Sequence, residues 1–147
     1  MSNSLSRAIL TAASPVLVAS GAAAWGMITK QLKDQRIEVH PDSAKLGGKP
    51  VAGPLTAFEQ ASVVGSHAEH IGGGKTFAEL SDEYMGALGA GDTERAEALA
   101  GPREQVMQAN FVRASLFTSV LAYGVSALVM GMGVVTGAAA AAVRDEN

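Results

Sequence analysis

Hydrophobic residues along the chain are concentrated in two long runs, Ala8–Thr29 and Ala114–Val143, which contain no Asp, Glu, Lys, Arg or His. A helix needs about 20 apolar residues to cross a bilayer, so each run predicts a transmembrane helix. The pattern therefore predicts a mainly α fold with two transmembrane helices. They flank a small, mostly helical polar domain with little or no strand (residues 30–113), and residues 1–7 and 144–147 are tails.

Two buried helices of a soluble bundle are the alternative explanation of these runs. A helix at the surface of such a bundle carries polar residues at helical spacing along its outer face, and neither run has them. Channels, pumps and proton relays usually carry ionisable residues inside their spans. The two runs therefore favour membrane anchors over buried helices and disfavour these transport functions.

The first part of the polar middle is expected to hold one short strand and one helix. Polar and apolar residues alternate over Arg36–His40, as in a strand, and Pro41 ends this pattern. A turn-rich stretch follows. Thr56–Ile71 then has the periodicity of a helix, and the three glycines at 72–74 are typical of a helix stop.

The second part of the middle is expected to be helical. Thr76 and Glu79 form a capping-box pattern, which predicts a helix that runs to about Leu88. Glycines then break this helix, and Thr93–Ala100 predicts a short separate helix. Pro102 is expected to begin a final helix that continues into the second apolar run.

Composition averaged over the chain hides this division, because 147 residues with 17% charged residues and a mean hydropathy of +0.19 resemble an ordinary small domain. Between Lys30 and Arg113, seven Lys and Arg residues stand against twelve Asp and Glu residues. An acidic middle is a poor partner for nucleic acid, which needs a basic face. The chain has no cysteine, so disulfides and thiolate metal sites are excluded.

Small residues four positions apart recur in both runs. In lipid, such pairs let helix backbones approach closely. The candidates for helix packing are Ala22, Gly26, Ala127, Gly131, Gly133 and Gly137. Their spacing fits packing within the hairpin or packing against a partner, and the sequence does not choose between them.

Three histidines are the candidate metal ligands. His67 and His70 are three residues apart, so they share one helix face, and Glu69 or the distant His40 would complete a set with them. The segment departs from the two-histidine zinc signature, which needs a spacing of four. A pair of exposed histidines near a helix end, favourable to the helix dipole, is the simpler explanation.

No catalytic or cofactor-binding motif is recognisable, and we expect no cofactor. Gly74-Lys75-Thr76 ends like a phosphate-binding loop, but that loop needs a glycine five positions before Gly74, where this chain has Glu69. Carboxylates near the predicted helix start at Thr76 suit the helix dipole, so we interpret them as structural.

Four segments resemble a family of small two-span actinobacterial membrane proteins. They are Lys49–Phe58, Gly73–Glu79, Arg113–Ser119 and Ala127–Gly131, and the similarity covers most of the chain. The chain departs from the family around residues 86–101, where it carries an extra Gly/Ala-rich helix. The resemblance implies a membrane location and a two-span architecture.

Members of this family often carry the label "aromatic ring-opening dioxygenase". A non-haem iron oxygenase needs two histidines and a carboxylate on one face of the metal, and a pocket for an aromatic ring. The chain offers His40, His67 and His70, two of them on one predicted helix, and its middle is poor in large apolar residues. We therefore interpret the label as a misnomer.

The orientation signals disagree. Basic residues favour the cytoplasm, and more of them flank the middle (Lys30, Lys33, Arg36, Arg103, Arg113) than the outer ends (Arg7, Arg144). The first 24 residues, however, have the layout of a secretory signal, with small residues before Trp25. Because the first run reaches full spanning length, we favour an uncleaved anchor. We favour an extracytoplasmic middle, partly from the family resemblance.

The sequence thus predicts a multi-pass protein of the plasma membrane that acts as a non-catalytic accessory or scaffold subunit of the bacterial cell envelope. Its expected partners are membrane lipid and other membrane subunits or a second copy, without nucleic acid. The alternative is a metal-binding enzyme or sensor that uses His67, Glu69 and His70.

Overall fold

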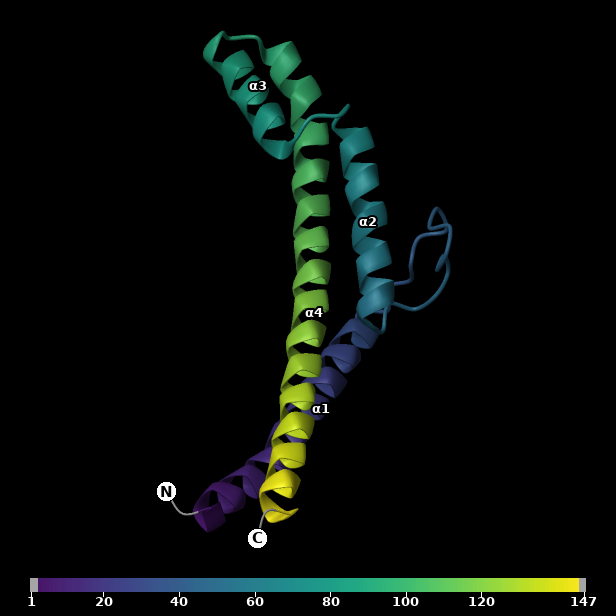
Figure 1. Ribbon diagram of the computed structural model, residues 1–147. Helices are drawn as coiled ribbons and strands as arrows, with labels where there is room; N and C mark the ends of the chain where they lie inside the picture. Colours follow the sequence, from purple (N-terminus) through teal and green to yellow (C-terminus); the bar gives the residue numbers. More distant parts are fainter. Residues whose placement is uncertain (1–2, 146–147) are drawn as a thin grey trace. The chain divides into compact units, whose positions relative to one another are not determined.

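The computed structural model describes residues 3–145 and consists mainly of four helices (Figure 1). Their bounds are Asn3–Asp34 (α1), Pro54–Ile71 (α2), Phe77–Gly89 (α3) and Thr93–Asp145 (α4). The mainly α prediction is confirmed. Within the described range there is no strand, and the alternating segment 36–40 contributes only one isolated antiparallel bridge, from Glu38 to Pro50.

The chain divides into two compact units. The first unit holds α1, residues 52–54 and α4 from Ser119 onward, and the second holds residues 38–51, α2 from Leu55, α3 and α4 up to Thr118. Of the two predicted tails, residues 3–7 begin α1 and residues 144–145 end α4. Residues 1–2 and 146–147 lie outside the described part.

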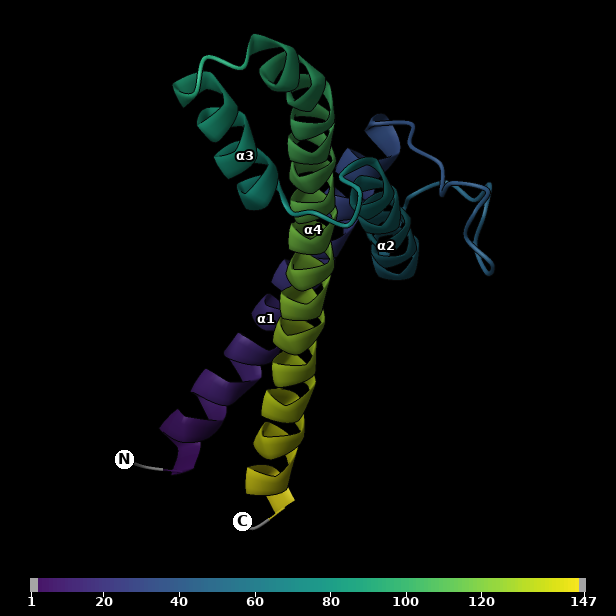
Figure 2. The same cartoon turned by 90° about the horizontal axis from the view of Figure 1, so that it is seen from above.

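In the first unit, α1 packs antiparallel to the C-terminal part of α4 (Figures 1 and 2). Glycines allow this approach. A Cβ atom added to Gly21 would lie 2.6 Å from Met130 Cγ, and one added to Gly133 would lie 2.7 Å from Val18 Cγ2. The hydroxyl of Ser14 donates a hydrogen bond to the carbonyl oxygen of Gly133 at 2.8 Å.

Tyr123 is the most buried large side chain of this unit, at 1% exposed. Its hydroxyl lies 2.7 Å from the hydroxyl of Thr29, and its ring meets the edge of Trp25 with centroids 4.6 Å apart. A buried tyrosine hydroxyl needs a hydrogen-bond partner, and Thr29 supplies it. On α1, Thr29 lies about four helical turns from Ser14. The two helices are therefore joined by hydrogen bonds at two separate points.

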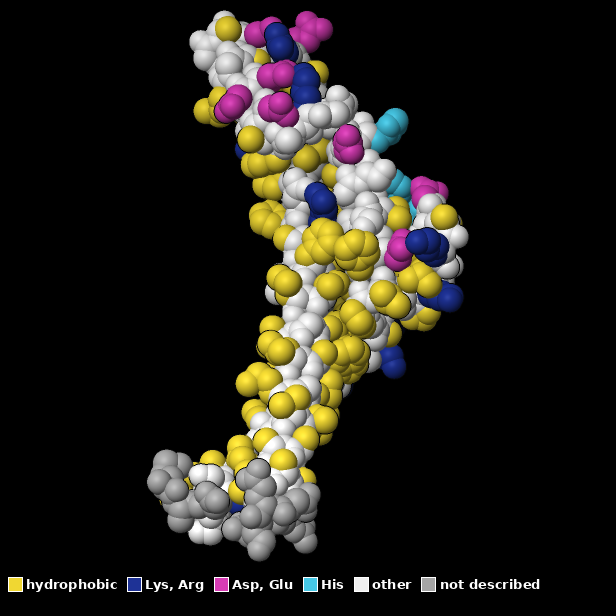
Figure 3. Space-filling view, viewed as in Figure 1, with side chains coloured by type: hydrophobic (Ala, Val, Ile, Leu, Met, Phe, Trp, Pro, Cys, Tyr) yellow, Lys and Arg dark blue, Asp and Glu magenta, His cyan; other side chains and the backbone are white. Residues whose placement is uncertain are grey.

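Helices α1 and α4 are both long and apolar enough to cross a membrane. A core helix of a soluble protein passes the same test but is mostly buried. Here only 6% of the most apolar 18-residue window of α1 and 17% of that of α4 are buried. Figure 3 shows hydrophobic side chains along the C-terminal half of α4, where Leu121, Leu128 and Val135 are 62 to 71% exposed.

The prediction of a separate helix at Thr93–Ala100 is wrong, because α4 runs through Pro102 without a break. A proline inside a helix removes one backbone hydrogen bond and costs about 3 kcal/mol. Side chains on both sides of Pro102 are packed, with Ala96 4% and Val106 2% exposed, and this packing offsets the cost. The ribbon of α4 bends over its first turns, as expected near a proline (Figure 2). The predicted continuation into the second apolar run is confirmed.

Helix α3 begins with the predicted capping box. The Thr76 hydroxyl accepts from the Glu79 amide, and the Glu79 carboxylate accepts from the Thr76 amide at 2.7 Å. Helix α3 packs on α4 through Arg103, whose Nε donates to Ser81 Oγ at 2.9 Å and whose guanidinium stacks on the ring of Phe77.

Helix α2 packs on the N-terminal half of α4. The rings of Phe58 and Phe117 meet edge to face, with centroids 5.8 Å apart. Towards the end of α2, Gly65 lies against the side chain of Arg113, which a Cβ at this position would approach to 3.0 Å. The predicted stop of α2 is confirmed, because Gly73 has a φ of 59°, in the left-handed region that glycine adopts without strain.

Candidate metal centre

The candidate site is built on a β-turn in the loop that precedes α2. The amide of Ser43 donates to the carbonyl oxygen of His40 at 3.0 Å, which closes the turn His40-Pro41-Asp42-Ser43. Proline is favoured at the second position of such a turn because its φ is already correct. The turn places the carboxylate of Asp42 beside the imidazole of His40.

The turn is held against α2 by contacts that do not use the His40 ring or the Asp42 carboxylate. The amide of His40 donates to Gln60 Oε1 at 2.8 Å, and the hydroxyl of Ser43 donates to Glu59 Oε2 at 3.2 Å. Val39, just before the turn, is fully buried, and its amide donates to the carbonyl oxygen of Lys49 at 2.9 Å. The turn therefore has a defined position on the helix.

Three side chains converge at this position. Nε2 of His67, from α2, lies 2.8 Å from Asp42 Oδ2, and Nδ1 of His40 lies 3.3 Å from the same oxygen. The two imidazole rings are nearly perpendicular, with centroids 4.7 Å apart. One donor atom from each residue lies within 4.8 Å of the other two.

The cluster lies beside an open groove of about 730 Å³ between the turn and α2. The groove is lined on the α2 side by one face of the helix, from Glu59 and Ser62 to Ser66, His67 and His70. The His40, Asp42 and His67 side chains are 46%, 64% and 42% exposed. All three side chains are therefore accessible to solvent.

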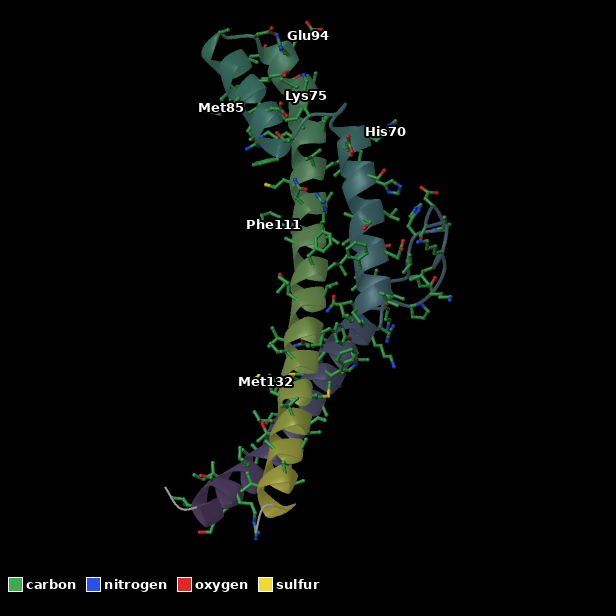
Figure 4. All side chains as sticks on the ribbon, viewed as in Figure 1. His70, Lys75, Met85, Glu94, Phe111 and Met132 are labelled. Atoms are coloured by element: carbon green, nitrogen blue, oxygen red, sulfur yellow. The ribbon has the colours of Figure 1, made fainter. Side chains whose placement is uncertain are left out.

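The structure distributes the predicted ligands differently from the sequence. Within residues 3–145, the group of donors close enough to share an ion is His40, Asp42 and His67. His70 lines the same groove near the end of α2 (Figure 4) but is outside this group. Glu69 lines a different groove, with Lys75 and Arg113, because residues 67 and 69 point to opposite sides of a helix.

Sequence reasoning missed Asp42 as a ligand. A local signal was present, because Pro41-Asp42 directly after His40 is typical of a turn that folds the carboxylate back. The pairing of this turn with His67 joins residues 25 positions apart, and no local pattern contains that information.

Chemically, the cluster combines two imidazole nitrogens and one carboxylate oxygen. These are borderline ligands that suit Zn²⁺, Fe²⁺ and related transition metals. The same contacts also make an ionic hydrogen bond between His67 and Asp42 when the imidazole is protonated. The geometry thus allows metal binding and, independently, a polar clamp between the turn and α2.

Two carboxylates of α3, Glu79 and Glu83, are engaged in structural contacts. The amide and hydroxyl of Thr76 donate to Glu79 and lower the pKa of its carboxyl. Lys75 Nζ donates to Glu83 Oε1 at 2.6 Å and lowers the pKa of that carboxyl. Both groups are held in the ionised form, whereas a general acid needs a raised pKa. They fit the structural interpretation.

The predicted packing residues fall on two different faces. Gly133 and Gly137 contact α1, through Val18 and Ser14. The other four are exposed, and a Cβ at Gly26 or Gly131 would have no atom within 4 Å. These four are Ala22, Gly26, Ala127 and Gly131. The structure adds Gly21, which the four-residue spacing did not select and which contacts Met130.

No family model, curated protein or solved structure matches this chain. Its function is therefore inferred from its residues and their geometry.

Proposed function

We propose that this protein is a non-catalytic accessory or scaffold subunit of the bacterial cell envelope, anchored in the plasma membrane by α1 and α4. The observation that carries this proposal is the apolar, exposed surface of these two helices. Their large hydrophobic side chains face outward, where water would be an unfavourable solvent and lipid a favourable one.

Exposed hydrophobic residues occur on both helices of the first unit. On α1 they include Ile9, Val16 and Met27, which are 52 to 64% exposed. Met132 on α4 points away from α1 (Figure 4). Two hydroxyls inside the apolar runs are satisfied locally, since Ser20 and Thr136 donate to carbonyl oxygens four residues earlier in their own helices. Ser14 and Thr29 instead bond to residues of α4. These are the properties that a bilayer requires of a spanning helix.

The length of α4 supports a protein with a part outside the membrane. Its 53 residues correspond to about 80 Å at 1.5 Å per residue, whereas the hydrocarbon core is about 30 Å thick. Residues 114–143 are the apolar portion, and the preceding residues carry charges such as Arg103 and Arg113. We infer that the portion before Arg113 belongs to the polar domain of residues 30–113.

Exposed small residues on each helix support association with another subunit. Ala22 and Gly26 on α1, and Ala127 and Gly131 on α4, are exposed, and a Cβ at Gly26 or Gly131 would have no atom within 4 Å. Small residues at this spacing commonly allow close contact between membrane helices. The proposed partner is another membrane subunit or a second copy of the chain.

The resemblance to small two-span actinobacterial membrane proteins supports the same location. For the orientation we propose an uncleaved first span and an extracytoplasmic middle. The chain has no cysteine, so single cysteines introduced at chosen positions report the orientation directly. Lys45→Cys, in the loop before α2, should react with a membrane-impermeant maleimide on intact cells, and Arg7→Cys should react only after lysis. The reverse pattern would overturn the orientation.

The accessory role is tested by purification of the tagged protein from native membranes in mild detergent, followed by mass spectrometry. A stoichiometric partner or a defined homo-oligomer is expected. Gly131→Leu should weaken this assembly, because the bulk is added on the exposed face. A strictly solitary monomer in the unaltered protein would overturn the proposal.

A second candidate function is a metal-binding enzyme or sensor. The observation in its favour is the convergence of His40, Asp42 and His67 beside a groove. Its predicted version used Glu69 and His70 with His67, and the geometry favours the new set.

A further inference from the structure

We propose that His40, Asp42 and His67 form a binding site for one divalent first-row transition-metal ion, with open coordination positions towards the groove beside α2. This inference does not depend on the accessory role; it rests on the second candidate function and names its ligands and its class of ion. It assigns metal binding to the second of the two compact units.

The donor atoms lie close to the spacing that a shared ion requires. Metal bonds of about 2.0 to 2.2 Å place neighbouring ligand atoms roughly 3 to 3.5 Å apart. Asp42 Oδ2 lies 2.8 Å from His67 Nε2 and 3.3 Å from His40 Nδ1. The full set lies within 4.8 Å, so small side-chain rotations bring all three donors to one centre.

The ligands are held in place before an ion arrives. Gln60 and Glu59 bind the turn that carries His40 and Asp42, and His67 lies on a regular helix. Val51, which follows the loop, is 1% exposed, and Val39 is completely buried. Contacts that hold the metal-binding residues in position in this way raise metal affinity.

Nδ1 of His40 accepts a hydrogen bond of 3.2 Å from the amide of Asp42. A metal ion would bind through the same lone pair, so the hydrogen bond from the Asp42 amide must break when the ion binds. Both imidazoles must be neutral in the complex, and binding therefore releases any proton that they carry.

The donor set selects the class of ion. Ca²⁺ and Mg²⁺ prefer sites made entirely of oxygen, whereas two imidazoles favour zinc, iron, nickel and copper. Three protein ligands leave at least one position for water or another small ligand. The groove of about 730 Å³ provides space on that side.

The test uses the full-length protein in detergent, purified without a polyhistidine tag and stripped with a chelator. Zn²⁺ is titrated by calorimetry, and Co²⁺ is added to record the visible spectrum of the bound ion. We expect one ion per chain. His40→Ala, Asp42→Asn and His67→Ala should each weaken Zn²⁺ binding by about tenfold or more and change the Co²⁺ spectrum.

His70→Ala and Glu69→Gln are the matched controls, because both residues lie on the same helix as His67 but outside the group of three. Both should bind Zn²⁺ like the unaltered protein. Asp42→Asn keeps the size of the side chain, and circular dichroism verifies that each variant is folded.

Two results would overturn the proposal. One is the absence of stoichiometric Zn²⁺ binding at neutral pH by the unaltered protein. The other is binding that depends on His70 or Glu69 but survives Asp42→Asn. Neither result would affect copurification with a membrane partner, so the accessory role is tested separately.

Discussion

The two units of this protein are stabilised by different kinds of contact. In the first unit, called the hairpin unit below, the helix backbones approach each other at Gly21 and Gly133, and large side chains such as Leu128 face outward. In the second unit, called the polar unit below, ion pairs and helix caps lie on the surface, whereas Val39 and Val51 are buried. Charged side chains gather over α3 and the first turns of α4 (Figure 3).

The proposed membrane location of the hairpin unit predicts such a difference. In lipid, burying an apolar side chain gains no hydrophobic free energy, so the association of helices depends on close packing and a few hydrogen bonds. Water does favour such burial, as for Val39 and Val51 in the polar unit, although Leu55, Met85 and Phe111 of that unit are 63 to 75% exposed. A substitution should therefore lower the stability of the unit in which it lies. In the hairpin unit it acts by disturbing close helix packing, and in the polar unit it acts by removing a cap or an ion pair. Trp25, the single tryptophan, reports on the hairpin.

The largest effect is expected from Gly133→Leu. Any side chain here meets Val18 Cγ2 at 2.7 Å and the carbonyl oxygen of Ser14 at 2.9 Å. Overpacking of this kind costs about 1 to 3 kcal/mol, so thermal unfolding in detergent, followed by Trp25 fluorescence, should shift to lower temperature. Gly124→Leu is the matched control, because a Cβ at this exposed position would have no atom within 4 Å, and it should leave unfolding of the hairpin unchanged. Equal destabilisation by both would refute the packing face.

A smaller effect is expected from Thr76→Ala in the polar unit. The substitution removes the capping box of α3, which contributes about 1 kcal/mol. Hydrogen exchange of the α3 amides should accelerate several-fold, while Trp25 fluorescence stays as it was. Thr118→Ala is the control, because that hydroxyl donates to Ala114 within its own helix and caps nothing. Unchanged exchange in α3 would show that the cap is dispensable.

Tyr123→Phe should have a weaker effect on the hairpin. It removes the 2.7 Å hydrogen bond to Thr29 and keeps the ring against Trp25. Side-chain hydrogen bonds between membrane helices average about 0.6 kcal/mol, so a small fall in the unfolding temperature is expected. Tyr84→Phe, in the polar unit, serves as the control. A loss as large as that of Gly133→Leu would mean that polar contacts dominate the hairpin after all.

The smallest effect concerns pH. The pKa values of Glu79 and Glu83 are below the ordinary value of 4.5 in the folded state, so these carboxylates bind protons more weakly folded than unfolded. Their stabilisation is present above pH 4.5 and is lost as the pH falls through the lowered pKa values. The protection of the α3 amides, relative to their intrinsic exchange rate at the same pH, should fall there, and Glu79→Gln with Glu83→Gln should reduce that fall. Protection that is insensitive to acid would contradict these contacts.

Local patterns predicted local structure well. The Thr76 cap and the glycine stop after Ile71 depend on residues within a few positions, and the structure has both. The break expected at Pro102 did not occur, because packing around Val106 outweighs the local penalty. The two apolar runs were likewise evident, since length and composition alone define a possible span.

Contacts between distant segments were beyond the sequence. Spacing of four selected Gly26 and Gly133 equally, yet only Gly133 faces the other helix, because the rotation of each helix is set by its partner. The sequence places two of the three histidines on one helix, and this counts as evidence against an oxygenase site. The sequence does not show that the loop brings His40 beside His67. The groove beside them is lined by small and polar side chains such as Ser62 and Ser66.

The donor atoms of the proposed metal site are nitrogen and oxygen, and the chain contains no thiol. Thiolate sites are lost when their sulfur is oxidised to sulfenic acid or to a disulfide, and imidazole and carboxylate undergo neither reaction. A centre made from His40, Asp42 and His67 would therefore not be lost through thiol oxidation.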